Sequence, residues 1–268
     1  NTSIATEAMR ALPVGVPKLM VSTMASGDVE PYVGATDVTM MYSVADVEGL
    51  NQLSRTVIAN AALAMVGMAS NDPDVEVEEK PTVGITMFGV TTPCVQHARE
   101  LLEDRGYETI VFHATGTGGR AMENLIREGV IDGVLDVTTT EWADELVGGV
   151  LSAGPERLDA AAETGIPQVV STGALDMVNF GPRDSVPGEF EGRQFHVHNP
   201  QVTLMRTTVE ENAELGEIIA GKLNAATGPT ALALPLGGVS MLDVEGEDFH
   251  DPEADRALFD ALREHLDA

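Results

Sequence analysis

The fold is decided by the stretch Thr109-Ile110-Val111-Phe112-His113-Ala114-Thr115-Gly116-Thr117-Gly118-Gly119-Arg120. Thr109 to Phe112 is apolar and predicts a strand, and the run that begins near Arg120 predicts a helix. Between them, three glycines in four residues allow a tight turn, whose N–H groups and following helix start can bind an anion such as a phosphate. The alternative is a strand-to-helix turn in which the glycines serve only the backbone shape.

The same plan repeats from residue 82 to the end of the chain. Strands are predicted over residues 83–88, 109–112, 133–137, 168–171, 194–198 and 230–234, and helices over 93–105, 120–128, 141–147, 156–163, 210–226 and 252–266. Residues 172–192 are expected to be irregular. Strands that alternate with helices indicate an α/β lobe with a mainly parallel sheet and right-handed crossovers.

The beginning of the chain predicts a smaller α/β lobe over residues 1–72. Its elements are a capped helix over 4–12, strands over 18–22 and 37–42, a hydroxyl-rich turn over 23–28, and an apolar helix over 47–68 that we expect to be buried on more than one face. Two strands and two helices are too few for a self-sufficient sheet, so we expect this lobe to be incomplete. Turn formers and acidic residues predict a linker over 73–81, followed by the second lobe over 82–268.

Acidic residues dominate the composition. The chain has 43 Asp and Glu but 15 Lys and Arg, a net charge of -28, which argues against nucleic acid or an anionic membrane as a partner. The chain also has only three lysines but twelve arginines. An excess of acidic residues together with few lysines is typical of a halophilic protein in a high-salt cytoplasm. The single cysteine, Cys94, fits a reducing interior. We expect no membrane-spanning stretch and no signal peptide.

Ligands of open parallel sheets bind outside the carboxyl ends of the strands. Five loops rich in Gly, Thr and Ser follow strands of the second lobe and predict a cleft with many small hydrogen-bond donors. The candidate ligand-binding residues there are Gly116, Thr117, Gly118, Gly119, Arg120, Thr140, Glu141, Gly173, Asp176, Gly237, Gly238 and Ser240. We expect Gly118→Val to abolish ligand binding and to leave the fold intact.

Two charged residues are candidates for chemistry. His113, at the strand end beside the glycines, is a candidate general acid or base. Arg206 is a candidate clamp for a carboxylate or phosphate, given how few cations the chain has. Cys94 is interpreted as a helix-packing residue. Ser171 and Ser240 lack the nucleophile-elbow context, so serine-hydrolase chemistry is not supported.

A histidine pair raises the question of a metal. His196 and His198 lie two apart on a predicted strand and so share one face, which suits a metal site. Glu141, Asp176 or Asp243 would have to complete the ligands, and none has diagnostic spacing. Hydrogen-bonding histidines are therefore the favoured interpretation, and no metal site is predicted.

Four runs of the sequence resemble one known family. They are AMRALPVGVPK (8–18), FHATGTGGRAME (112–123), HNPQVTLMRTT (198–208) and PLGGVS (235–240), the last with Asp251-Pro252 and Ala257-Leu258-Phe259. Over the whole chain the sequence resembles the Tm-one-like ATP-binding domain family, the family of the tomato tobamovirus-replication inhibitor. The resemblance implies two Rossmann-like lobes, binding of ATP with Mg²⁺, self-association into a homo-oligomer, and a TIM-barrel protein as a partner.

The resemblance also bears on the start of the chain. It implies that a glycine-rich loop directly precedes the segment matching Asn1-Thr2-Ser3 in family members. We therefore expect a first-lobe segment, with part of the phosphate cradle, to be missing here. The candidates that would still form one wall of the nucleotide site are Thr2, Ser3, Ser22, Thr23, Ser26 and Gly27.

Two function classes remain open. In the first, an enzyme or enzyme subunit acts with ATP on a small anionic metabolite in an inter-lobe cleft. The amides of Gly116 to Gly119 would hold the anion, Arg206 would clamp it, His113 or His198 would carry the proton, and Asn199 is a further ligand-binding candidate. In the second, the protein is a non-catalytic, nucleotide-dependent protein-binding module. The lack of a Walker A sequence and of an evident catalytic dyad keeps the second class open.

Overall fold

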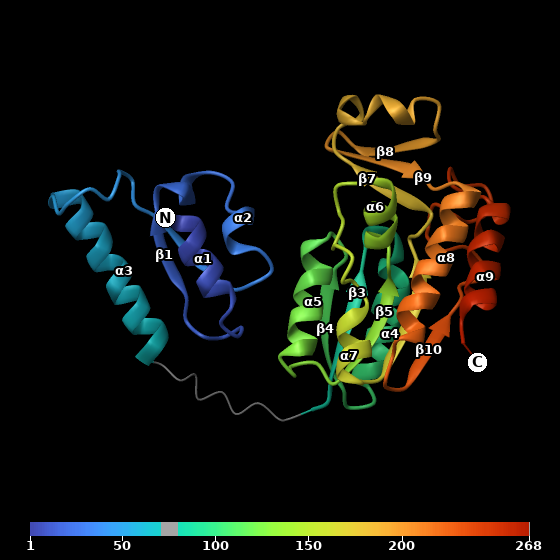
Figure 1. The fold of residues 1–268 in the computed structure, drawn as a ribbon, viewed down its shortest axis with the longest axis horizontal. Coiled ribbons are helices and arrows are strands. Elements are labelled where there is room, and N and C mark those ends of the chain that lie inside the picture. Colours follow the sequence, from blue (N-terminus) through green and yellow to red (C-terminus); the bar gives the residue numbers. More distant parts are fainter. Residues whose placement is uncertain (71–79, 268) are drawn as a thin grey trace. The chain divides into compact units, whose positions relative to one another are not determined.

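The computed structural model describes residues 1–70 and 80–267. It divides into two compact units, Asn1–Glu79 (unit 1) and Lys80–Ala268 (unit 2), and each is described by itself. The predicted linker over 73–81 falls largely outside the described residues. Both units are α/β, and parallel strands form their main sheets (Figure 1), which confirms the predicted fold class.

Unit 2 is built on a five-stranded parallel sheet with strand order β10-β6-β5-β3-β4. The strands are β3 (Thr82–Met87), β4 (Glu108–His113), β5 (Gly133–Thr138), β6 (Gln168–Gly173) and β10 (Thr230–Ala233). Counted along the chain, this is the 2-1-3-4-5 order of flavodoxin-like doubly wound sheets, in which the strand order reverses between the first and third strands. Here that switch point lies between β3 and β5.

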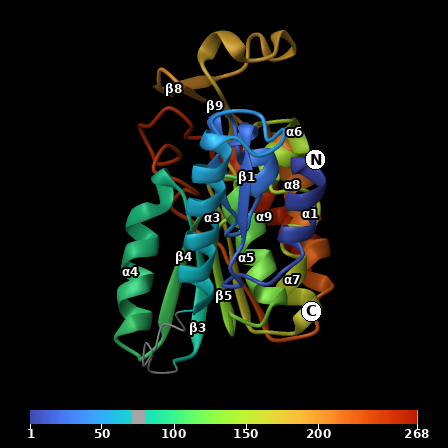
Figure 2. The same ribbon diagram turned by 90° about the vertical axis from the view of Figure 1, so that its left-hand side faces the viewer.

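Helices cover the two faces of this sheet unequally. Figure 2 shows α4 (Thr92–Glu103) on one side of the strands and α5 (Thr117–Arg127), α7 (Asp159–Thr164) and α9 (Pro252–His265) on the other. The helices α6 (Glu141–Val147) and α8 (Val209–Asn224) pack together, and α9 packs on α8 through Leu258 and Leu262. Because α9 does not return to the α4 face, no helix among the described residues of unit 2 covers that face over β6 and β10.

A small antiparallel sheet interrupts the plan after β6. It contains β7 (Met177–Phe180), β8 (Phe195–Asn199) and β9 (Val202–Arg206) in the order β7-β9-β8. Only β8 had been predicted, and the prediction of an irregular segment over 172–192 was wrong for β7. All four residues of β7 are buried, so the strand shows no alternation. The turn signal Asn199-Pro200 would have indicated the β8–β9 hairpin, in which the Asn199 side chain accepts a hydrogen bond from the Gln201 N–H at 2.8 Å.

The described part of unit 1, residues 1–70, contains a two-stranded parallel sheet and three α-helices. Its elements are α1 (Thr2–Arg10), β1 (Leu19–Ser22), α2 (Glu30–Val33), β2 (Thr39–Tyr42) and α3 (Gln52–Ser70). The Asn1 side chain caps α1 by accepting from the Ser3 N–H at 3.0 Å. Lys18, fully buried at its side chain, pairs with Asp37 at 2.5 Å and ties the start of β1 to the start of β2.

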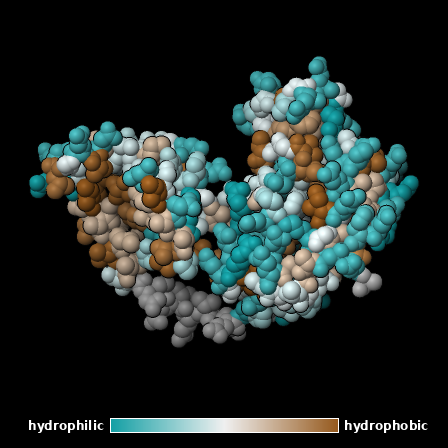
Figure 3. All heavy atoms as spheres, in the orientation of Figure 1, coloured by the Kyte–Doolittle hydropathy of each residue, from teal (hydrophilic) through white to brown (hydrophobic). Residues whose placement is uncertain are grey.

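The burial and the composition of the long helix α3 differ from two of our expectations. We predicted burial on more than one face, but within the described chain only Ser54 and Ala61 of α3 are buried. Large apolar side chains such as Leu63 and Val66 are exposed, and Figure 3 shows hydrophobic side chains gathered over α3. By length and composition alone, α3 is also apolar enough to cross a membrane, because Arg55 is its one charged residue, so the expectation that no stretch meets that test was wrong.

Candidate functional site

A pocket lies at the carboxyl edge of the five-stranded sheet. It has a volume of about 240 Å³, and it is lined by the ends of β5 and β6 and by the segments that follow β3 and β10. The polar groups that line it come from Thr91, Cys94, Ser171, Gly173, Gly238 and Ser240. We call it the edge pocket. Thr91 follows β3 and Val137 belongs to β5, so the pocket lies at the switch point of the doubly wound sheet, where such folds bind ligands.

The start of α4 forms one wall of the edge pocket. Pro93 and Cys94, in the first turn of α4, line the pocket. The positive end of the helix dipole therefore lies at the pocket and favours a negatively charged ligand group. None of its lining residues in the described part of the chain carries a charge.

The glycine loop, residues 113–120, does not line this pocket, and a carboxylate of the protein itself occupies two of its amides. Oε1 of Glu141 accepts hydrogen bonds from the Gly116 N–H at 2.7 Å and the Gly119 N–H at 3.0 Å. Glu141 is 1% exposed. The structure therefore places an internal anion on two amides of this loop, and the binding of an external anion by the other residues of the loop stays a prediction.

Glu141 belongs to a buried ionic cluster around Arg157. The Arg157 guanidinium donates to both oxygens of Asp136 at 2.6 and 2.7 Å, to Glu141 at 2.7 Å and to Glu123 at 3.3 Å. Burial raises the pKa of Glu123, although the attraction of Arg157 and two backbone N–H groups oppose the shift. Sequence reasoning missed Arg157, and its only signal was the rarity of basic residues in the chain.

A chain of threonines connects this cluster to the edge pocket. The Thr86 hydroxyl donates to Asp136 at 2.6 Å and accepts from the Thr138 N–H at 2.9 Å. The Thr138 hydroxyl lies 2.7 Å from the Thr91 hydroxyl, which lines the pocket. The buried charges are thus connected to one pocket wall through three threonines.

The predicted anion clamp, Arg206, is also committed internally. It is 4% exposed, and its guanidinium donates to Asp243 at 3.1 Å, to Asp255 at 3.2 Å and to the Phe249 carbonyl at 2.8 Å. Asp243 in turn accepts from the Val239 N–H at 2.9 Å and so orders the loop after β10. Arg206 therefore positions this loop through Asp243, and its contact with an external anion stays a prediction.

Ser240 links the edge pocket to a buried carboxyl group. Its hydroxyl donates to Oδ2 of Asp176 at 2.7 Å, and Asp176 is fully buried. Burial raises the pKa of Asp176 to about 7, against the hydrogen bond from Ser240 and the attraction of Arg206, which lower it. Of the predicted edge residues, Gly173, Gly238 and Ser240 line the pocket, whereas Thr140 is buried against Asn179 and Asp176 lies behind Ser240.

The buried Asp176 predicts a pH dependence of stability. Its pKa in the unfolded chain is about 3.9, below the value of about 7 in the folded state. The resulting stabilisation is complete below about pH 4 and is lost as the pH rises through about 7. We expect the unfolding free energy of unit 2, followed by the fluorescence of its sole tryptophan, Trp142, to fall over this range and Asp176→Asn to reduce the fall. Equal slopes in the two proteins would contradict this, and the exposed change Asp104→Asn is the control.

The predicted proton carriers lie away from the edge pocket. His113 ends β4 and is exposed, with its ring 5.5 Å from that of Phe88. His198 and Asn199 are exposed on β8 of the antiparallel sheet, and His196 is hydrogen-bonded to Asp248 at 2.6 Å. Among residues 1–70 and 80–267, no group of three or more His, Cys, Asp or Glu is arranged to hold a metal.

The candidates in unit 1 gather at the start of α1 and the end of β1. The Thr2 hydroxyl lies 2.8 Å from that of Ser22, and Ser22 also accepts from the Met24 N–H at 3.1 Å. The Ser26 hydroxyl donates to the Thr23 carbonyl at 3.0 Å, which closes a short turn before Gly27. This places the hydroxyls of Thr2 and Ser22 side by side.

Comparison with known proteins matches the chain over nearly its full length. The profile described as "Uncharacterised protein family (UPF0261) C-terminal domain" matches residues 80–268, and that of the N-terminal domain of the same family matches residues 1–74. A UPF0261 protein of Clostridium tetani is 61% identical over 98% of this chain and 65% of its own length. A UPF0261 protein of Rhizobium meliloti is 55% identical over 98% of this chain and 65% of its own length.

A plant relative is similar over the same region. The "ToMV resistance protein Tm-1(GCR237)" of Solanum lycopersicum is 52% identical over 96% of this chain and 35% of its own length. The chain thus spans just under two thirds of the bacterial relatives and about a third of the tomato protein. These matches agree with the family resemblance drawn from the four sequence runs.

Proposed function

Because the chain belongs to the uncharacterised protein family UPF0261, we propose for it a function that the family designation leaves open: it is a nucleotide-binding protein that acts on a small anionic metabolite. The observation that carries the proposal is the edge pocket at the switch point of the unit 2 sheet. Its volume of about 240 Å³ is below the roughly 300–1,000 Å³ typical of sites for drug-sized ligands. It therefore suits a compact metabolite better than a whole nucleotide.

The pocket chemistry supports a carboxylate as the metabolite. The start of α4 offers positive potential, and the hydroxyls of Thr91, Ser171 and Ser240 offer neutral hydrogen bonds. Ser240, backed by Asp176 at 2.7 Å, is the lining residue that can pass a proton to or from a titratable group. We assign acid–base chemistry to this pair in preference to His113 and His198.

The nucleotide is proposed to bind to unit 1. The family resemblance supports ATP with Mg²⁺, and the paired hydroxyls of Thr2 and Ser22 lie at a helix start, the usual place for a phosphate. The acidic composition supports a cytoplasmic location in a high-salt cell. The family resemblance supports self-association and binding to a TIM-barrel protein.

A direct binding experiment tests the metabolite site. We expect at least one small mono- or dicarboxylate to bind the intact chain in calorimetry, in the presence or absence of ATP and Mg²⁺. Ser171→Leu fills the pocket and should weaken that affinity about tenfold or more. The matched control, Ser185→Leu, changes an exposed serine of the same unit and should bind as the wild type does. If no carboxylate binds, or if Ser171→Leu binds equally well, the edge pocket is not the site.

One observation favours the second function class, the nucleotide-dependent protein-binding module. The groups first expected to perform chemistry, His113, His198 and Arg206, do not line the edge pocket. Incubation of the intact protein with ATP, Mg²⁺ and a metabolite extract separates the classes. Turnover that is lost in Ser240→Ala supports an enzyme, whereas ligand binding without turnover supports the module.

A further inference from the structure

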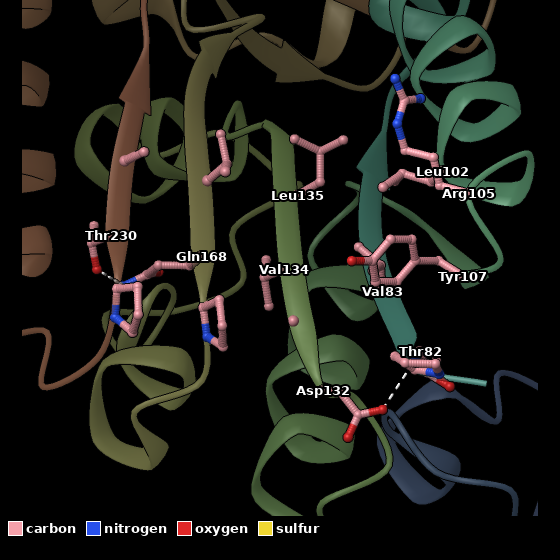
Figure 4. Close-up of a pocket in the computed structure, with 16 residues that line it drawn as sticks. Thr82, Val83, Leu102, Arg105, Tyr107, Asp132, Val134, Leu135, Gln168 and Thr230 are labelled. Carbon is pink, nitrogen blue, oxygen red and sulfur yellow. Dashed lines mark hydrogen bonds between the residues drawn. The ribbon is translucent and has the colours of Figure 1, made fainter. Parts of the chain in front are cut away.

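Buried charge behind the edge pocket distinguishes it from a larger cavity of unit 2. That cavity, of about 580 Å³, lies against β3, β5, β6 and β10, and its lining includes both Arg105 and Asp132 (Figure 4). Because charges of both signs line it, its charge selects no ligand. No lining residue of the edge pocket carries a charge within the described chain, but the Asp176 carboxyl lies directly behind its wall, 2.7 Å from the Ser240 hydroxyl.

The surroundings of Asp176 carry more negative than positive charge. Arg206 of β9 attracts the carboxyl, and Asp243 of the loop after β10 repels it. Nη2 of Arg206 also lies 3.1 Å from Asp243 and 3.2 Å from Asp255 of α9. His250 faces this group too, with Nδ1 3.5 Å from the Asp243 carbonyl oxygen. Three carboxyl groups thus lie around one guanidinium, and a ligand anion in the pocket would add a further negative charge.

Asp176 takes up a proton more readily than an ordinary aspartate. It is fully buried, and its Oδ1 atom has no hydrogen-bond partner among the described residues. Burial raises the pKa of the Asp176 carboxyl to about 7, against the hydrogen bond from Ser240 and the attraction of Arg206, and Asp243 adds to the rise. Near neutral pH, both the protonated and the ionised form of Asp176 are therefore populated.

The hydrogen bonds of Ser240 depend on that proton. A serine hydroxyl donates one hydrogen bond and accepts two. Oγ of Ser240 accepts one from the Leu242 N–H at 3.0 Å. When Asp176 is ionised, the Ser240 hydroxyl donates its hydrogen to Oδ2, and the oxygen lone pair that is left for the pocket repels a carboxylate. When Asp176 is protonated, its O–H can donate to Oγ of Ser240, and the Ser240 hydrogen is then free to donate into the pocket.

We propose that a proton on Asp176 reverses the hydrogen bond between Asp176 and Ser240, so that the edge pocket binds a carboxylate together with one proton. The proton comes from water and stays on Asp176, so unit 2 takes up the carboxylate without a net gain of negative charge. An uncharged amide of the same shape binds in either state, because Ser240 can accept from its N–H or donate to its carbonyl. The inference rests on the function proposed for the edge pocket and adds what controls it: the carboxylate is released as the pH rises above about 7.

Calorimetry on the intact chain tests this linkage with acetate, lactate and succinate, each compared with its amide. At least one of these carboxylates should bind the wild-type protein about tenfold more weakly at about pH 8 than at about pH 6, and its amide should bind equally at both. Titrations in two buffers of different ionisation enthalpy should show uptake of about one proton per carboxylate at about pH 8 and little uptake at about pH 6.

The variant Asp176→Asn provides a second measurement. The asparagine amide can donate to Ser240 at every pH, so this variant should bind the carboxylate without proton uptake and with the same affinity at both pH values. At about pH 8 it should therefore bind about tenfold more tightly than the wild type. The control, Asp104→Asn, changes an exposed aspartate of the same unit and should keep the wild-type pH dependence.

Three results would overturn the inference and leave the proposed carboxylate site in place. They are carboxylate binding without proton uptake, a pH dependence that Asp176→Asn retains, and an amide that weakens at higher pH as much as its carboxylate does. The proton count is measured on the wild type, so it decides the matter even if Asp176→Asn folds poorly. If none of the three carboxylates binds at either pH, the proposed function fails and the inference fails with it.

Discussion

Replacement of Arg157 by methionine will lower the free energy of unfolding of unit 2 by about 3–5 kcal/mol. Arg157 is 1% exposed and is the cation that Asp136, Glu141 and Glu123 share. Without it, three buried carboxylates lose their counter-charge and repel one another. The N–H groups of Gly116 and Gly119 alone would not stabilise the Glu141 carboxylate against the two neighbouring carboxylates. We therefore expect Glu141 to bind these two amides less tightly in the variant.

Chemical denaturation followed by Trp142 fluorescence measures this loss. Trp142 is the only tryptophan and lies buried in α6 of unit 2, so its signal reports on that unit. The deficit should shrink as the pH is lowered, because protonation neutralises the abandoned carboxylates, and it should change little with salt, because the cluster is buried. Arg127→Met, which breaks the exposed pair with Glu163, should cost under about 1 kcal/mol. A comparable loss in the two variants would show that the buried cluster has no special role.

The strands and helices of unit 2 could be largely predicted because local pattern determines them. Strands such as Gly133–Thr138 are short apolar runs between turn formers, and helix α6 was predicted with the bounds that the structure has. Strands β7 and β9 were missed because burial in the antiparallel sheet is set by partners far along the chain. Helix α3 was predicted to be buried because its residues are mostly apolar, but most of it is exposed. An apolar composition shows that a helix is hydrophobic and does not show which part of the protein covers the helix.

The partners of the site residues could not be predicted in the same way. Glu141, Asp176 and Arg206 were predicted as ligand-binding residues from their places in the sequence, but a charged group near a strand end can face a ligand or an internal partner. Arg157 lies 16 residues after Glu141 in the chain and no periodicity connects them. Only the three-dimensional structure shows that the negative group on the glycine loop comes from the protein itself.

A second large effect concerns the glycine loop: Gly118→Ala will destabilise unit 2 by about 3 kcal/mol. A Cβ at Gly118 would lie 1.8 Å from the carbonyl oxygen of His113 and 2.7 Å from its carbonyl carbon. Both are backbone atoms, so the entry to α5 must shift, and with it the amides that bind Glu141. The expectation that Gly118→Val spares the fold was therefore wrong, since valine adds further bulk at the same position.

A glycine of the same unit provides the matched control. Gly221 lies on the exposed side of α8, and a Cβ there would meet nothing within 4 Å. Gly221→Ala should stabilise unit 2 by about 0.5–1 kcal/mol, because alanine loses less backbone entropy in a helix. Urea denaturation monitored at Trp142 compares the two variants. If Gly118→Ala unfolds like the wild type but loses carboxylate binding, the loop is an external anion site after all. If it unfolds early and the remaining folded protein still binds carboxylate, the loop is a structural element that Glu141 stabilises, and the ligand site is the edge pocket, which the loop does not line.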